Sequence, residues 1–77
     1  MAQILSPLPG TFYRKPAPDQ PPFKDVGDTV AVGDVVGIVE VMKSFNQVTS
    51  DVAGTITAFL AEDEDAVMPG QPLVDLA

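Results

Sequence analysis

The stretch DTVAVGDVVGIV, residues 28–39, recurs in degenerate form as DAVMPGQPLVDL, residues 65–76, at an offset of 37. A second pair, SPLPGTF at residues 6–12 and SDVAGTI at residues 50–56, is offset by 44. Each half predicts the same order of strands and turns, because Val-rich runs bounded by Gly and Pro favour strands. Two such halves predict an all-β fold, a flattened β-barrel or sandwich of two antiparallel sheets with pseudo-twofold symmetry.

Composition limits the possible functions. A chain of 77 residues predicts a single small domain spanning 1–77. Cys and His are both absent, which removes most metal sites and the usual pairs of nucleophile and base. We therefore expect no metal site and no catalysis by this chain alone. A net charge of −7 argues against nucleic acid and against an anionic membrane surface as partners.

Helices, membrane spans and targeting signals are not expected. The best helical candidate, AEDEDAVM at residues 61–68, is stopped at once by Pro69-Gly70. No apolar run approaches the ~20 residues that cross a bilayer. The N-terminus lacks the basic and apolar segments of a secretory signal. The expected location is therefore the cytoplasm or, in a plant, the plastid stroma.

The first half of the repeat holds an insertion. The two offsets differ by seven residues, which must fall between Phe12 and Asp28. The Pro-rich sequence YRKPAPDQPPF lies there, and it predicts an exposed, stiff projection near residues 13–22 rather than a strand. A surface insertion without a task is the alternative, because loops accept added length at small cost.

A hairpin with a lysine at its tip is predicted between the two halves. The sequence EVMKSFNQV, residues 40–48, places Met42 and Lys43 at the reversal. Two-residue hairpin turns favour Asn-Gly or Gly-rich pairs because both residues need positive φ, so Met-Lys is a poor local choice. Such a conflict indicates a functional position, and Lys43 becomes the candidate for covalent modification. A longer loop with a solvated lysine is the alternative reading.

These features together resemble the biotinyl domain of biotin carboxyl carrier proteins, especially the acetyl-CoA carboxylase type. The family motif Glu-Ala-Met-Lys-Met corresponds to Glu40, Val41, Met42, Lys43 and Ser44. The protruding "thumb" of the family corresponds to a segment centred on Pro16, Ala17, Pro18 and Asp19. The resemblance extends from Ile4 to Leu76. Two positions depart from the motif, where Val replaces the usual Ala and Ser replaces the Met after the lysine.

The resemblance implies a non-catalytic carrier with biotin amide-linked to Lys43. The implied partners are a biotin protein ligase, a biotin carboxylase and a carboxyltransferase, between which biotin shuttles carboxylate. Acetyl-CoA is the implied acceptor, in fatty acid biosynthesis, while propionyl-CoA or pyruvate stays open. Met42 and Glu40 are expected to shape the turn or contact the ligase, and for Glu40 an ordinary solvated carboxylate is the alternative.

Two other functions stay open at this point. A lipoyl-type carrier would share the barrel and the lysine hairpin, although the thumb and Met42 argue against it. An unmodified barrel that serves as an interaction module is the second, because Ser44 alters the surface that a ligase would meet. The thumb is expected to pack against the biotin ring or to shield it. The acidic run at residues 62–65 is expected to be a solvated turn, since it lacks the Gly and the distal Glu of a calcium loop.

Overall fold

The computed structural model describes residues 2–77, so Met1, the first residue of the expected domain, lies outside the described residues. Residues 2–77 contain strands and turns but no helix, in agreement with the all-β prediction. The strands are β1 (Ala2–Leu5), β2 (Gly10–Tyr13), β3 (Thr29–Val30), β4 (Val35–Val41), β5 (Ser44–Thr49), β6 (Gly54–Phe59), β7 (Asp65–Val67) and β8 (Pro72–Leu76). The helical candidate at 61–68 instead forms a turn that leads into β7.

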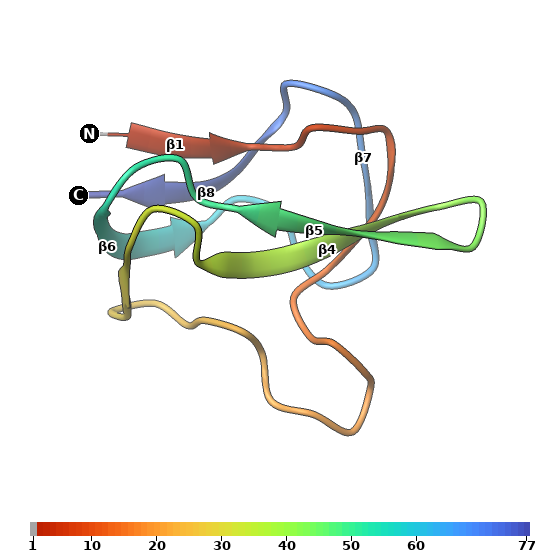
Figure 1. Cartoon of the computed structure of the whole chain (residues 1–77), viewed down its shortest axis with the longest axis horizontal. Helices are drawn as coiled ribbons and strands as arrows, with labels where there is room; N and C mark the ends of the chain where they lie inside the picture. The colour runs from red at the N-terminus through yellow and green to blue at the C-terminus, as the bar shows by residue number, and fades with distance from the viewer. Residues whose placement is uncertain (1) are drawn as a thin grey trace.

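The strands form two four-stranded sheets. One has the order β1-β8-β6-β3 and the other has the order β5-β4-β2-β7, with antiparallel neighbours throughout. The offsets of 37 and 44 convert the second sheet into the first, strand by strand and in the same order. The molecule measures 32 × 27 × 19 Å and is therefore flattened along its shortest axis. Figure 1 looks down that axis. The predicted pseudo-twofold sandwich is confirmed.

The symmetry extends to individual hydrogen bonds. Gly33 N donates to Ser50 O at 2.8 Å, and in the other half Gly70 N donates to Ser6 O at 2.8 Å. Both glycines have a positive φ, of 94° and 81°, which a residue without Cβ adopts without strain. The two turns that lead into β4 and β8 are therefore built by the same local chemistry.

The core lies between the two sheets and takes apolar side chains from both. Its buried members are Ile4, Phe12, Val30, Val36, Val39, Val48, Ile56, Ala61, Val67, Leu73, Val74 and Leu76. The Phe12 ring lies against Gly37, where an added Cβ would come within 2.5 Å of Phe12 Cε1. The β4–β5 register shifts between Val35 and Gly37, so Val36 and Gly37 are both buried. This bulge explains why β4 shows no clean alternation of apolar and polar residues.

Three features at the periphery position the candidate site. The chain from 14 to 28 joins β2 to β3 without a strand or helix and extends to one side of the sheets, orange to yellow in Figure 1. Tyr13, which the predicted insertion included, is the last residue of β2 and pairs with Ile38. The β4–β5 hairpin lies at one end of the long axis, and both chain ends lie at the other, where Ala2 pairs with Leu76.

Candidate functional site

The β4–β5 hairpin reverses the chain over two residues, Met42 and Lys43. Val41 pairs with Ser44 across the turn. Met42 has φ 49° and Lys43 has φ 69°, so both occupy the left-handed region that a two-residue type I′ turn requires. The tight reversal predicted from the sequence is confirmed, and the alternative of a longer loop is wrong.

Side chains of the hairpin support this unusual turn. The Glu40 Oε2 atom accepts a hydrogen bond from Lys43 N at 3.2 Å. Asn46 Nδ2 donates to Val39 O and to Ser44 O, each at 3.3 Å. A left-handed conformation costs about 1–2 kcal/mol for a residue with a Cβ, and a single hydrogen bond returns about 0.5–1.5 kcal/mol. The three hydrogen bonds from the two side chains are therefore comparable in size to the cost of the two left-handed residues, and the paired strands add further support.

The tip of the hairpin is exposed to solvent. Met42 is 93% exposed, and Lys43 and Ser44 are also exposed. Within residues 2–77, no hydrogen bond or ion pair involves Lys43 Nζ. The two ion pairs among the described residues involve Arg14 and Lys24. The Lys43 side chain is thus exposed, and its amine has no polar partner among the described residues.

A groove of about 520 Å³ lies beside the hairpin. Four segments line it: the end of β2, the Pro-rich loop, the outer face of the hairpin, and the turn before β7. The lining residues are Tyr13, Lys15, Pro16, Ala17, Pro18, Ile38, Phe45, Asp63 and Glu64. Three of the four residues predicted for the thumb, Pro16, Ala17 and Pro18, line this groove, and Asp19 does not. Gln20 N donates to Ala17 O at 3.1 Å and closes the turn that holds Asp19.

Sequence reasoning missed several residues of this site. Phe45 is 68% exposed on β5 and lines the groove, and Glu64 reaches it from the turn before β7. Asn46 was also missed. The one sequence signal for Phe45 was its position. It is an aromatic residue at the edge of the predicted hairpin, where the two sheets cannot bury it. The contact of Glu64 with the groove had no local signal, because it depends on how the two halves of the chain assemble.

Other regions offer less for chemistry. Residues 2–77 contain no group of three or more His, Cys, Asp or Glu placed to hold a metal ion. No helix of the described chain is long and apolar enough to cross a membrane.

At the turn before β4, a hydrogen bond from the Ala31 N–H lowers the pKa of the Asp34 carboxyl, and Lys24 adds to this effect. Desolvation opposes the shift.

Comparison with known proteins identifies a family and several relatives that are similar to this chain in sequence. The model of the biotin/lipoyl family, described as "Biotin-requiring enzyme", matches residues 2–76. The chloroplastic biotin carboxyl carrier protein of acetyl-CoA carboxylase 1 from Arabidopsis thaliana is 50% identical over 70 residues, which are 91% of this chain and 25% of that protein. The biotin carboxyl carrier protein of acetyl-CoA carboxylase from Haemophilus influenzae is 45% identical over 71 residues, 92% of this chain and 46% of that protein.

A solved structure supports the fold. The crystal structure of Kluyveromyces lactis urea carboxylase matches 99% of this chain with a TM-score of 0.78 and 28% sequence identity, over 6% of the longer protein. The chain spans between a quarter and a half of the length of the two curated relatives. The similarity therefore concerns one part of each larger protein.

Proposed function

Because the chain belongs to the biotin/lipoyl family, we propose that it is a biotin carrier domain of a biotin-dependent carboxylase and that Lys43 is the attachment site. One observation carries the proposal: the only lysine at a two-residue reversal among residues 2–77 is also exposed and unpaired. The relatives named above are carrier proteins of acetyl-CoA carboxylase, which favours that enzyme and acetyl-CoA as the acceptor.

The attachment step can be written for Lys43. Its neutral Nζ attacks the carbonyl carbon of biotin that a ligase has activated as a mixed anhydride with a nucleotide phosphate. An N–C amide bond replaces the acyl–oxygen bond, the nucleoside monophosphate leaves, and one proton passes to solvent. The narrow hairpin suits this step, since an exposed turn of two residues fits inside a foreign active site more readily than a broad loop.

The remaining hairpin residues prepare the amine for the ligase. Glu40 holds the Lys43 amide and so keeps the turn in its reversed conformation. Met42, almost fully exposed, offers a flexible apolar contact. Val41 and Ser44 form the last pair of the hairpin and present their side chains close to the modified position. These four residues would therefore form the surface that the ligase inspects.

The domain supplies reach and high effective concentration, and it performs no catalysis itself. When bound, biotin supplies a ring nitrogen that accepts a carboxyl group and gives it away. A biotin carboxylase and a carboxyltransferase would be the two partners that meet it. The chloroplastic and bacterial relatives favour the plastid stroma or the cytoplasm as the location.

The groove fits the heterobicyclic ring that the lysine would carry. Tyr13, Ile38 and Phe45 give it apolar walls, while Asp63 and Glu64 add carboxylates that can accept N–H groups. Pro16, Ala17 and Pro18 close the remaining side, which is the role that the family resemblance gives to a thumb.

The test is the intact mass of the chain after co-expression with a biotin protein ligase. We expect one added biotin in the wild type and none in Lys43→Arg. Lys15→Arg and Lys24→Arg are matched controls and should each retain the label. Biotin on the Lys43→Arg variant would refute the site. A lipoyl adduct after co-expression with a lipoate ligase, or no adduct with either ligase, would replace the proposal with a lipoyl carrier or an unmodified barrel.

A further inference from the structure

The Pro-rich loop has few contacts of its own to hold it in place. Within segment 15–22, the one backbone hydrogen bond is the local bond from Gln20 N to Ala17 O. Among residues 2–77, no hydrogen bond or ion pair joins this segment to either sheet. Four Pro residues in the sequence stiffen the segment, but stiffness alone does not orient it. Its position must therefore be set where it leaves and rejoins the body of the domain.

Arg14 lies at that junction, and its backbone hydrogen-bonds to the returning end of the loop and to the turn before β7. Phe23 N donates to Arg14 O at 3.0 Å, which closes the neck of the loop. Arg14 N donates to Asp63 Oδ1 at 2.8 Å, which ties the neck to the turn before β7. That turn also lines the groove. One residue thus connects the loop to the opposite wall of the groove.

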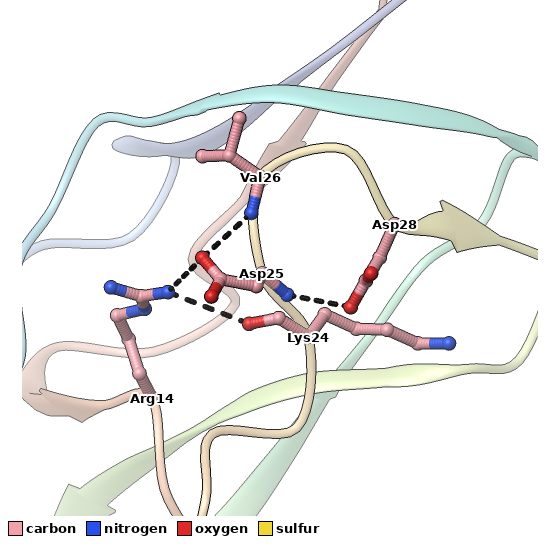
Figure 2. Close-up of polar contacts among 5 residues, drawn as sticks. All are labelled: Arg14, Lys24, Asp25, Val26 and Asp28. Atoms are coloured by element: carbon pink, nitrogen blue, oxygen red, sulfur yellow. Dashed lines mark hydrogen bonds and ion pairs between the residues drawn. The ribbon is translucent and has the colours of Figure 1, made fainter.

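The Arg14 side chain adds a second set of contacts. Its Nη2 lies 3.3 Å from Asp25 Oδ1 and donates to Lys24 O at 3.5 Å, as Figure 2 shows. Its guanidinium carbon lies 3.9 Å from the centre of the Phe59 ring, at the end of β6 in the other sheet. A planar guanidinium can stack on an aromatic face and bond at its edge at the same time, which an ammonium cannot do.

The acceptor for Arg14 is itself held in place. Val26 N donates to Asp25 Oδ1 at 2.8 Å, and Asp25 N donates to Asp28 Oδ2 at 2.9 Å (Figure 2). The returning end of the loop is therefore a rigid turn, and the guanidinium joins this turn to the sheet. Arg14 Nε is buried and has no hydrogen-bond partner among the described residues, so the side chain keeps this position at a cost in hydration.

We propose that Arg14 is a positioning residue that holds segment 15–22 as one wall of the groove beside Lys43. The residue acts through the loop and does not itself line the groove. The use of the groove by a biotin ring rests on the proposed function, whereas the placement of the loop by Arg14 does not. The two can therefore fail separately.

The direct test is the backbone order of the loop measured by 15N relaxation. Segment 15–22 has amides at Lys15, Ala17, Asp19 and Gln20, and we expect rigid order parameters of about 0.85 in the wild type. In Arg14→Gln these values should fall below about 0.6, while the β4–β5 hairpin keeps its wild-type values. Arg14→Lys keeps the charge but loses the stacked, forked geometry, and it should give intermediate values.

A matched control separates positioning from general stability. Ile4→Val removes a methyl group from the core at β1 and should lower the melting temperature without changing the loop order parameters. Wild-type loop order in both Arg14 variants would overturn the proposal. Equal loss of loop order in Ile4→Val would overturn it as well. If Arg14→Gln does not fold, Asp25→Asn removes the negative charge that pairs with the Arg14 guanidinium and should still lower loop order.

A second measurement links the loop to the carrier. Biotinylation should shift the amide resonances of Ala17 and Phe45 in the wild type, and these shifts should vanish in biotinylated Arg14→Gln. Persistence of the shifts in that variant would contradict the proposal. Shifts absent from the biotinylated wild type would refute ring docking in the groove, while the order parameters would still decide the role of Arg14.

Discussion

Glu64 has φ 72°, and the pseudo-symmetry pairs it with Gly27, which has φ 93°. Both residues stand third in equivalent turns, 25–28 and 62–65, and each turn is closed by a backbone N–H that donates to an Asp carboxylate at 2.9 Å. One half therefore uses glycine at a left-handed position where the other half uses a residue with a side chain. Replacing Glu64 by Gly should stabilise the protein.

The magnitude follows from backbone terms alone. The left-handed conformation costs about 1–2 kcal/mol for a residue with a Cβ, and Glu64→Gly removes this cost. Glycine loses more conformational entropy on folding, which costs about 0.5–1 kcal/mol and offsets part of the gain in stability. We expect a net gain of about 0.5–1 kcal/mol for Glu64→Gly. In a domain of 77 residues, this raises the melting temperature by about 2–8 °C.

Gly27→Ala is the reciprocal experiment. A Cβ at Gly27 would meet nothing within 4 Å, so only the backbone conformation opposes the substitution. We expect a loss of about 1 kcal/mol and a melting temperature lower by about 4–8 °C. Thermal unfolding followed by circular dichroism measures both variants. A destabilised Glu64→Gly together with an unaffected Gly27→Ala would refute the equivalence of the two turns.

Three further predictions concern the core, the hairpin and acid stability. Gly37→Ala should lower the free energy of unfolding in urea by about 1–3 kcal/mol, because its Cβ would press on the Phe12 ring; an unchanged midpoint would contradict the packing described. Glu40→Ala should speed hydrogen exchange of the Lys43 amide by about 2–12-fold, from 0.5–1.5 kcal/mol, and a Glu40→Gln control should exchange more slowly than Glu40→Ala. The backbone hydrogen bond lowers the folded-state pKa of Asp34 below its usual 3.8, so its contribution to stability is present above pH 3.8 and is lost as pH falls through the lowered pKa. Asp34→Asn should therefore show a shallower loss of melting temperature below pH 3.8 than the wild type, and identical acid profiles would count against the shift.

Much of the fold was predictable because its determinants are local. The turns at Gly33 and Gly70 recur in the sequence with the strands that follow them, so the repeat predicts both sheets. The insertion was likewise visible as a difference between two offsets. The register of β4 was not predictable, because the bulge near Gly37 depends on the Phe12 ring that packs there from another strand.

The candidate site divides in the same way. Lys43 could be predicted as a functional residue because Met-Lys is a poor residue pair for a two-residue hairpin turn. Glu40 could be predicted as a supporting residue because it lies three residues before Lys43. The groove could not be found, because Tyr13, Phe45 and Glu64 are distant in sequence and meet only after both halves assemble. The contacts of Arg14 with Phe59 depend on the same assembly.

The place of the chain ends has a mechanical consequence. The pair of Ala2 with Leu76 is the symmetry equivalent of the pair of Asn46 with Val39, so the chain ends hold in their own sheet the place that the β4–β5 turn holds in the other, at the opposite pole of the molecule. Any polypeptide joined to either end would emerge from that pole, while the tip at Lys43 lies at the other end of the 32 Å axis (Figure 1). A rotation about such a joint would move the Lys43 amine over a greater distance than it moves the parts of the domain that lie nearer to the chain ends.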